Sequence, residues 1–251
     1  MTSRKRPLAD FLARNPFPSP LTLGFFYREK MRAIHRIAPD GPIRNALEIG
    51  GGRSGLTRLL YPSASVTNLE MDDRLADAPC NHEPGVRFVC GDATALDFTD
   101  ASFDLVTMFD VLEHIPDHRR AADEAVRVLA PGGCLLISAP NERWRFPYYR
   151  FMKPVCPSEQ HMFEEWGHVR RGYSVDQLGE LISGSCERTA TFISPLTVLC
   201  HDVSFSLAPA RLRRAICLAL WPVTWLGYAS HGAHSPGTET ASMWRKPTVV
   251  R

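Results

Sequence analysis

The stretch "LEIGGGRSGLTRLL" contains a glycine-rich loop that could bind a ligand. Gly50, Gly52 and Gly55 have the spacing G-x-G-x-x-G and follow a short apolar run. Such a loop lets the backbone approach a ligand closely, and the following helix directs its N-terminal N–H groups at a pyrophosphate or a carboxylate. Glu48 lies two residues before Gly50. Its charge would repel a pyrophosphate and favour a ligand that also carries an ammonium or a sulfonium group.

Further acidic residues follow three later apolar runs. Glu70, twenty residues after Gly50, can accept hydrogen bonds from the two hydroxyls of a ribose. Asp92, in "VCGDAT", can accept a hydrogen bond from an adenine amino group. In "MFDVLEHIPD" four residues crowd one junction: Phe109, Asp110, Glu113 and His114. Their acidity offers charge-assisted contacts to a sulfonium and an ammonium, whereas a nicotinamide would gain little from it.

Two kinds of sequence pattern follow one another along the chain from residue 43. Short apolar runs alternate with helical patterns, which predicts an α/β doubly wound fold, a parallel sheet with helices on both faces. The best-defined helix covers 116–133, where Asp117 can cap the start and Pro131 helps to end it. Ligands of such sheets bind beyond the carboxyl ends of the strands. The predicted strands are 43–49, 65–70, 86–90, 103–109 and 133–140.

Composition and cysteine spacing narrow the classes of function. The chain has 251 residues and a net charge of +2, which gives no reason to expect nucleic acid as a partner. Its seven cysteines form no C-x-x-C pair, so we expect reduced thiols, no metal site and a cytoplasmic location. No signal-peptide pattern is visible. The longest apolar run, 215–229, is too short for a membrane span and contains Pro222.

Taken together, the motifs resemble those of the class I S-adenosylmethionine-dependent methyltransferases, in the subgroup described as type 11 or ubiquinone-biosynthesis-like. "LEIGGGRSG" is similar to the glycine-rich first motif of the family, and "NLEMD" to its acidic second-strand end. "GDATALDFTDASFDLVTMFDVLEHIPD" resembles its third and fourth motifs, and "EAVRVLAPGGCLLISAPN" its fifth. The resemblance runs from Asn45 to Asn141, with Gly-Gly-Gly in place of the usual Gly-Cys-Gly or Gly-x-Gly.

The resemblance implies a Rossmann-like sheet, mostly parallel, with an antiparallel last strand formed by "GTETASMWRKP". It also implies S-adenosyl-L-methionine as the cofactor and S-adenosyl-L-homocysteine as its product. The resemblance places Glu48, Gly50 and Gly52 at the methionine part of the cofactor, Glu70 at the ribose, Asp92 and Ala93 at the adenine, and Phe109 and Asp110 beside the methionine and the methyl group. Gly51, Met71 and His114 complete the predicted set of cofactor contacts.

Two other functions fit parts of the same pattern. A NAD(P)-dependent short-chain dehydrogenase needs Tyr-x-x-x-Lys on a helix and a Ser upstream, and this chain has Tyr149, Lys153 and Ser138. Pro147 and Pro154 bracket that stretch, however, and leave room for a short turn at most. A non-catalytic, methyltransferase-like binding protein is the other alternative, although none of the motifs is degraded.

We expect one methyltransferase domain over 1–251. It comprises an N-terminal helical lid (1–42), a cofactor-binding core (43–140), a substrate-side insertion (141–175) and a C-terminal part of the sheet with a cover helix (176–251). The acceptor contacts predicted from the lid and the insertion are Tyr27, Arg28, Trp144, Tyr148 and Tyr173. The helical stretch 207–227 could contact a membrane surface or hold a lipid-like substrate, but we favour a buried cover helix there.

The reaction that these residues predict is an in-line displacement, in which the protein mainly has to align the nucleophile. A hydroxyl acceptor also needs a base nearby. His168, in "GHVRRGY", is the first candidate because it opens the segment that returns from the insertion, and His114 and Asp110 are the alternatives. The sequence therefore predicts methylation, at oxygen, of a small-molecule or glycolipid-like acceptor.

Overall fold

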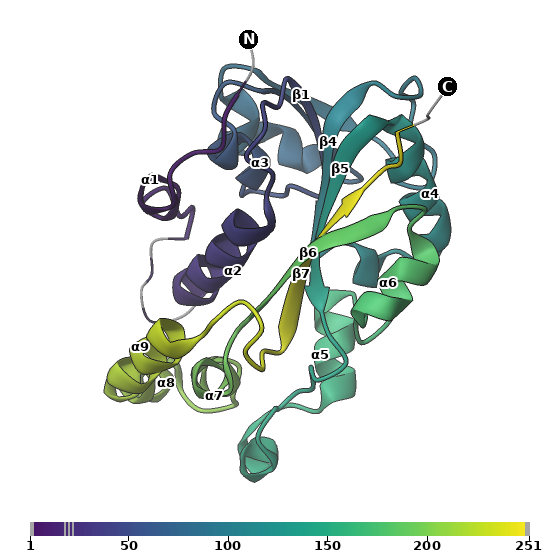
Figure 1. Ribbon diagram of the computed structural model, residues 1–251. Coiled ribbons are helices and arrows are strands. Elements are labelled where there is room, and N and C mark those ends of the chain that lie inside the picture. The colour runs from purple at the N-terminus through teal and green to yellow at the C-terminus, as the bar shows by residue number, and fades with distance from the viewer. Residues whose placement is uncertain (1–2, 18, 20, 22, 249–251) are drawn as a thin grey trace.

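The computed structural model describes residues 3–17, 19, 21 and 23–248. In this part of the chain the strands form one sheet of seven, in the order β3-β2-β1-β4-β5-β7-β6 (Figure 1). The first five strands of that order run parallel, and β7 is antiparallel to both of its neighbours, as the resemblance implies. The strands are β1 (Asn45–Ile49), β2 (Ser65–Glu70), β3 (Val86–Cys90), β4 (Phe103–Phe109), β5 (Leu129–Pro140), β6 (Ser185–Phe192) and β7 (Glu239–Arg245).

Helices cover both faces of this sheet (Figure 1). Successive residues of β1 enter two separate cores, because side chains alternate across a strand. Ala46 packs in the core that contains Met31 of α2, and Leu47 packs with Ala121 of α4. The helices are α1 (Leu8–Leu12), α2 (Leu23–Ile37) and α3 (Leu56–Leu60) on one face, α4 (His118–Val128) and α6 (Val175–Leu181) on the other, and α5 (Glu159–Trp166), α7 (Pro195–Ser204), α8 (Ala210–Ala219) and α9 (Trp221–Ser230) toward one end.

Most elements have the bounds that the sequence predicts. β2, β3 and β4 coincide with the predicted strands, and the Asp117 side chain caps α4 by accepting a hydrogen bond from the N–H of Arg120 (3.1 Å). Four short 3₁₀ helices also occur in the described residues: η1 (Asp73–Asp77), η2 (Pro79–His82), η3 (Leu112–His114) and η4 (Arg150–Val155). β6 has no counterpart among the predicted strands, since it is an edge strand in which exposed polar residues interrupt the apolar pattern.

The stretch 207–227 differs from the prediction of a buried cover helix. It forms two helices, which meet at Leu220, and Pro222 lies in the first turn of α9, where a proline costs no hydrogen bond. Within α8 only Cys217 is buried, so the prediction is wrong for that helix. No helix of the described residues is long and apolar enough to cross a membrane.

Candidate active site

The carboxyl ends of β1, β2, β3 and β4 surround a cleft of about 620 Å³. This volume is within the range typical of pockets that hold small molecules and cofactors. Eight of the eleven residues that the sequence assigns to the cofactor line the cleft: Gly50, Gly52, Glu70, Met71, Asp92, Ala93, Asp110 and His114. The fold thus brings together residues from four separate motifs at one edge of the sheet.

The glycine loop forms the floor of this cleft. Gly50 and Gly52 have φ angles of +70° and +57°, which side chains rarely adopt. A side chain at Gly51 would also collide with its neighbours, since a Cβ there would lie 2.5 Å from Oδ1 of Asn68. At Gly52, in contrast, nothing lies within 4 Å of a Cβ position, and its N–H donates to Glu70. Gly51 therefore packs closely against the protein, whereas Gly52 faces open space on the side of the cleft.

Three residues of the predicted set do not line the cleft. Glu48 is buried behind the loop, where both of its carboxylate oxygens accept from the N–H of Thr57 (3.3 Å), at the start of α3. Burial raises its pKa to about 7. Glu48 thus stabilises the start of α3. This role replaces the predicted contact between Glu48 and an ammonium group. Gly51 packs as described above, and Phe109 is buried with its ring centroid 5.9 Å from Nζ of Lys30.

A second, smaller cavity of about 200 Å³ adjoins the cleft. Its walls are mostly aromatic and come from α2, the insertion after β5, and α7. Asp110 and His114 line both the cleft and this cavity, so the two spaces meet at these side chains. The aromatic lining residues are Phe26, Tyr27, Trp144, Trp166, Phe192 and Phe205, with His168 and His201 beside them. We call this space the acceptor cavity.

An ion pair stands at the junction of the two spaces. Nζ of Lys30 donates to Oδ2 of Asp110 (2.7 Å), and the hydroxyl of Ser138 donates to Oδ1 (2.6 Å). Burial alone would raise the pKa of Asp110, but Lys30 and Ser138 lower it below its ordinary value. Asp110 also has a φ of +56°, a conformation that few residues other than glycine, asparagine and aspartate adopt. The protein therefore holds an ionised carboxylate at this point, in a backbone conformation that occurs often at functional sites.

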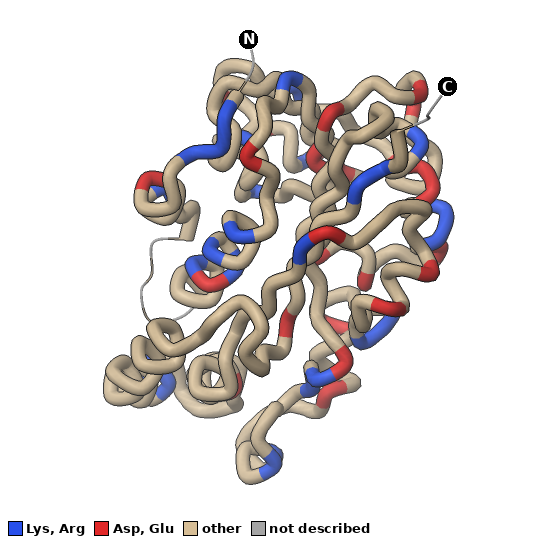
Figure 2. Tube along the Cα trace, in the orientation of Figure 1, with Lys and Arg blue, Asp and Glu red and all other residues tan. Residues whose placement is uncertain are grey.

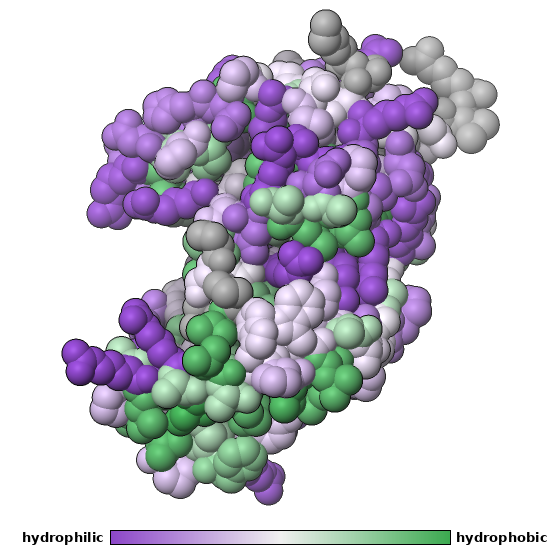
Figure 3. Space-filling view, turned by 90° about the vertical axis from the view of Figure 1, so that its left-hand side faces the viewer, coloured by the Kyte–Doolittle hydropathy of each residue, from purple (hydrophilic) through white to green (hydrophobic). Residues whose placement is uncertain are grey.

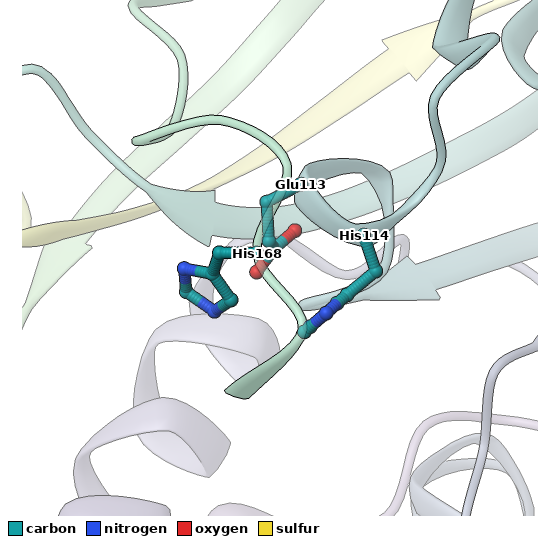
Figure 4. Close-up of side chains that lie close together, drawn as sticks. All are labelled: Glu113, His114 and His168. Carbon is teal, nitrogen blue, oxygen red and sulfur yellow. The ribbon is translucent and has the colours of Figure 1, made fainter. Parts of the chain in front are cut away.

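Glu113, His114 and His168 gather at the same junction (Figure 4). One side-chain nitrogen or oxygen atom of each residue lies within 4.8 Å of such an atom of the other two, and the two imidazole centroids are 4.8 Å apart. Burial, together with Asp110, raises the pKa of Glu113 to about 8. Burial and the charge of His114 lower the pKa of His168 to about 4. At neutral pH, Glu113 is therefore mostly protonated and His168 is a neutral imidazole.

This cluster has unused hydrogen-bonding capacity. Both carboxyl oxygens of Glu113 and Nδ1 of His168 are buried and have no hydrogen-bond partner among the described residues. Buried polar atoms without partners are rare in native proteins, because each costs free energy. Such atoms in a native protein call for an explanation, and a catalytic role is one that fits their place in the wall of the acceptor cavity. The sequence did not assign Glu113 a role of its own, although its position beside His114 in "VLEHIP" is visible there.

The segment after α5 holds His168 in place. The N–H of Val169 donates to the carbonyl of Glu113 (3.0 Å), and Arg170 donates through Nη1 to the carbonyls of Leu112 (2.7 Å) and Ile115 (2.6 Å). These bonds tie the end of the insertion to the turn after β4. Sequence reasoning missed Arg170, because its partners are backbone carbonyls that no motif identifies.

Two of the five predicted acceptor contacts line the acceptor cavity. Tyr27 reaches it from α2, and Trp144 reaches it from the insertion, where its ring stacks on Phe163 at a centroid distance of 5.5 Å. Burial raises the pKa of the Tyr27 hydroxyl to about 12, so this group is neutral. Lys30, which also lines the cavity, is an additional residue that the sequence did not indicate.

The other three predicted contacts lie elsewhere. The guanidinium of Arg28 stacks over Tyr228 of α9, 5.5 Å from its centroid, and so points away from the cleft. Tyr148 does not line the acceptor cavity but a separate hollow on the insertion. Tyr173 is buried beneath the turn after β4 and donates to the carbonyl of Leu112 (3.0 Å). These three predictions of acceptor contacts are therefore corrected.

The dehydrogenase alternative is not supported. The hydroxyl of Tyr149 donates to the backbone carbonyl of Pro195 (2.7 Å), and Lys153 is exposed on η4. Ser138 is engaged with Asp110. The three residues form no common site, as the flanking prolines indicated.

Comparison with known proteins gives matches to methyltransferases. A family model described as "Methyltransferase domain" matches residues 47–137. The chain is 40% identical over 118 residues to the phthiotriol/phenolphthiotriol dimycocerosates methyltransferase 1 of Mycobacterium ulcerans (strain Agy99), a match that covers 43% of this chain and 43% of that relative. The match therefore spans less than half of the relative's length.

A second relative matches over a longer part of the chain. This chain is 29% identical over 236 residues to the 2-methyl-6-phytyl-1,4-hydroquinone methyltransferase of Synechocystis sp. (strain ATCC 27184 / PCC 6803 / Kazusa). The match covers 89% of this chain and 71% of that protein. The fold of this chain is similar to that of the N-methyltransferase NodS from Bradyrhizobium japonicum WM9 in complex with S-adenosyl-L-homocysteine. The TM-score is 0.56, the sequence identity is 18%, and the match covers 96% of each chain. Fold, family model and motifs agree, and residues 47–137 form a class I S-adenosylmethionine-dependent methyltransferase domain.

Proposed function

We propose that this protein transfers a methyl group to an oxygen of a small-molecule or lipid-like acceptor that occupies the acceptor cavity. The observation that carries the proposal is the meeting of two spaces at Asp110 and His114. One space has the glycine loop and acidic residues suited to the cofactor, and the other has an aromatic wall suited to an apolar acceptor. A reaction in line between donor and acceptor needs such a junction, since alignment can contribute ~7–11 kcal/mol of the barrier.

The residues of the cleft fit S-adenosylmethionine. The space above Gly52 is free for a ligand, and Glu70 uses one carboxylate oxygen on the Gly52 N–H, which leaves the other for a ribose hydroxyl. Asp92 lies at the far end of the cleft, where the adenine amino group would lie. The ionised Asp110 lies at the junction, where a positive charge on the ligand is favourable. When bound, this cofactor supplies a methyl group that is activated by the sulfonium.

The cluster at the junction suits a hydroxyl acceptor. Neutral Glu113 can donate a hydrogen bond, and neutral His168 can accept one, so together they would orient an acceptor O–H. As the acceptor oxygen forms its bond to the methyl carbon, its proton becomes strongly acidic and can pass to an imidazole nitrogen of His168. Because His168 is unprotonated at neutral pH, it is ready to take that proton. His114 lies beside it and is the second candidate for the base.

The shape and lining of the acceptor cavity favour an acceptor with a ring or an apolar chain. Aromatic side chains from several elements line it, and the polar side chains of Asp110 and His114 line it where it meets the cleft. Two relatives are named for acceptors of this kind, a phthiotriol or phenolphthiotriol dimycocerosate and a hydroquinone with a phytyl chain. We therefore propose a lipid-like phenol or alcohol, which would place the enzyme at a membrane surface as a peripheral protein.

A methyl-transfer screen tests this proposal. Purified protein and S-adenosylmethionine are incubated with alkyl phenols, prenylated hydroquinones and long-chain alcohols, and with the matching amines. We expect an O-methyl product, identified by mass spectrometry and by the chemical shift of its methyl carbon, and the same yield with a chelator present. Methylation of the amines or of ring carbon alone would contradict transfer to oxygen. Cofactor binding without transfer to any acceptor would favour the non-catalytic alternative.

A further inference from the structure

A hollow of about 860 Å³ lies on the insertion, outside both the cleft and the acceptor cavity. Four exposed cationic side chains line it: Arg143, Arg145, Arg150 and Lys153. Figure 2 shows Lys and Arg at the tip of this segment, between β5 and α5. Glu159 is the single carboxylate in the lining, and it is engaged by Arg171 and by the N–H of Phe146.

The four cations have no ion pair with a carboxylate among the residues that the structure describes. Arg74, in contrast, is an exposed arginine that pairs with a carboxylate, that of Asp72. A hollow lined by several cations without acidic partners attracts multiply charged anions such as phosphates. The hollow is therefore complementary to phosphate groups.

Exposed apolar side chains lie next to these cations. Phe151 and Val155 belong to η4 with Arg150 and Lys153, and they are 67% and 47% exposed. The N–H of Leu207, itself 72% exposed, donates to the carbonyl of Val155 (2.8 Å), which joins the insertion to the loop before α8.

The apolar surface continues on α8 and α9. Leu212 and Leu218 of α8 are 50% and 60% exposed, and Leu226 of α9 is 61% exposed. Figure 3 shows hydrophobic residues gathered at the end of the molecule where α8 and α9 lie. An exposed apolar surface of this kind on a soluble domain marks an interaction site. We call the four cations, Phe151, Val155, Leu207 and the exposed apolar residues of α8 and α9 the docking face.

The docking face adjoins the acceptor cavity. Phe146 lines the hollow on the insertion, and Trp166 lines the acceptor cavity. The two rings pack edge-on at a centroid distance of 5.9 Å. Phe205, two residues before Leu207, also lines the cavity. A molecule bound at the docking face is thus one layer of aromatic side chains away from the acceptor cavity.

We propose that the docking face binds an anionic lipid bilayer. The cations would bind the phosphates of the headgroups, and the exposed apolar side chains would enter the boundary of the acyl chains. The interleaving of Phe151 and Val155 with Arg150 and Lys153 favours a bilayer over a nucleic acid, because a polyanion alone would leave the apolar side chains in water. The purpose of this binding, access to a membrane-resident acceptor, rests on the proposed function; the binding itself does not.

Vesicle sedimentation tests the proposal with the full chain. Vesicles of phosphatidylcholine are compared with vesicles of equal parts phosphatidylcholine and phosphatidylglycerol. We expect binding to the anionic vesicles that weakens as salt is added. The double variant Arg150→Ala/Lys153→Ala should bind about 30-fold more weakly, since each basic residue near an anionic surface contributes about fivefold. The matched control Arg4→Ala/Arg44→Ala removes two exposed charges near the Ser3–Ile43 bridge and should bind as the wild type does.

A second variant tests the apolar part. Phe151→Ser/Leu207→Ser changes two exposed side chains, and we expect it to lose binding to vesicles while its affinity for S-adenosylhomocysteine is unchanged. Absence of vesicle binding by the wild type, or equal loss in the Arg4/Arg44 control, would overturn the proposal. Retention of an oligonucleotide or of inorganic phosphate without vesicle binding would also overturn it. If the protein methylates a water-soluble acceptor but does not bind vesicles, the proposed function is retained and the proposal for the docking face alone is refuted.

Discussion

Glu113 gives the sharpest test of the electrostatics of the site. Its side chain is 1% exposed, both of its oxygens lack hydrogen-bond partners among the described residues, and its pKa is raised from 4.5 to about 8. A carboxyl whose pKa is raised on folding contributes full stability below its unfolded pKa, and that contribution is lost as the pH rises through its folded pKa. Wild-type protein should therefore lose stability from this group between about pH 5 and pH 8.

The substitution Glu113→Gln removes this titration and preserves the shape of the side chain. Each pKa unit corresponds to about 1.4 kcal/mol, so the wild type should lose ~2–4 kcal/mol from Glu113 over this range, and the variant should not. The unfolding free energy of the variant minus that of the wild type should accordingly rise by the same amount from pH 5 to pH 8. Any fixed cost of the amide is the same at both pH values and cancels.

Urea denaturation at both pH values measures this difference. Glu142→Gln serves as the control, because Glu142 is exposed on the insertion, and its difference from the wild type should not change with pH. The experiment uses apo protein, so it does not depend on the identity of the acceptor. Parallel stability curves for wild type and Glu113→Gln would refute the reasoning, since they would mean that Glu113 is ionised in the folded protein at neutral pH.

Three further predictions concern ligand binding, turnover and stability. Glu70→Ala and Asp92→Ala should each weaken the binding of S-adenosylhomocysteine by ~1–3 kcal/mol, measured by calorimetry, as expected for a lost hydrogen bond; unchanged affinity in both would contradict their placement. His168→Gln should lower turnover of a hydroxyl acceptor by about 10²–10⁴-fold with cofactor affinity intact, and full activity would exclude it as the base. Gly51→Ala should destabilise the protein by ~1–3 kcal/mol in urea unfolding, because its Cβ would meet Asn68, and a wild-type midpoint would show that the loop can relax.

The local parts of the site are those that the sequence predicts well. Gly50 and Gly52 adopt the positive φ angles that their spacing indicates, and Asp110 and His114 lie together because they belong to one turn after β4. Glu70 and Asp92 join them, since the carboxyl ends of parallel strands meet at one edge of the sheet. Patterns of glycines, strands and strand ends therefore suffice for the cleft.

The parts that depend on long-range packing are those that the sequence does not reveal. Lys30 lies eighty residues before Asp110, on a helix whose other residues look like ordinary core and surface, so its ion pair is not visible in any motif. Glu48 precedes the glycine loop as expected, but the direction of its side chain depends on the start of α3. Arg28 and Tyr173 have the right chemistry for an acceptor contact, and only the tertiary structure shows that they face α9 and the turn after β4.

The measurement that tests the central claim most directly is a calorimetric titration of the purified protein with S-adenosylhomocysteine, with NAD and NADP in parallel. The wild type should bind S-adenosylhomocysteine at low-micromolar concentration and neither nicotinamide cofactor. Asp110→Asn keeps the size of the side chain and should weaken that binding, because it removes the negative charge at the junction of the two cavities. Binding of NAD or NADP in place of S-adenosylhomocysteine would contradict the account of both the cleft and the acceptor cavity.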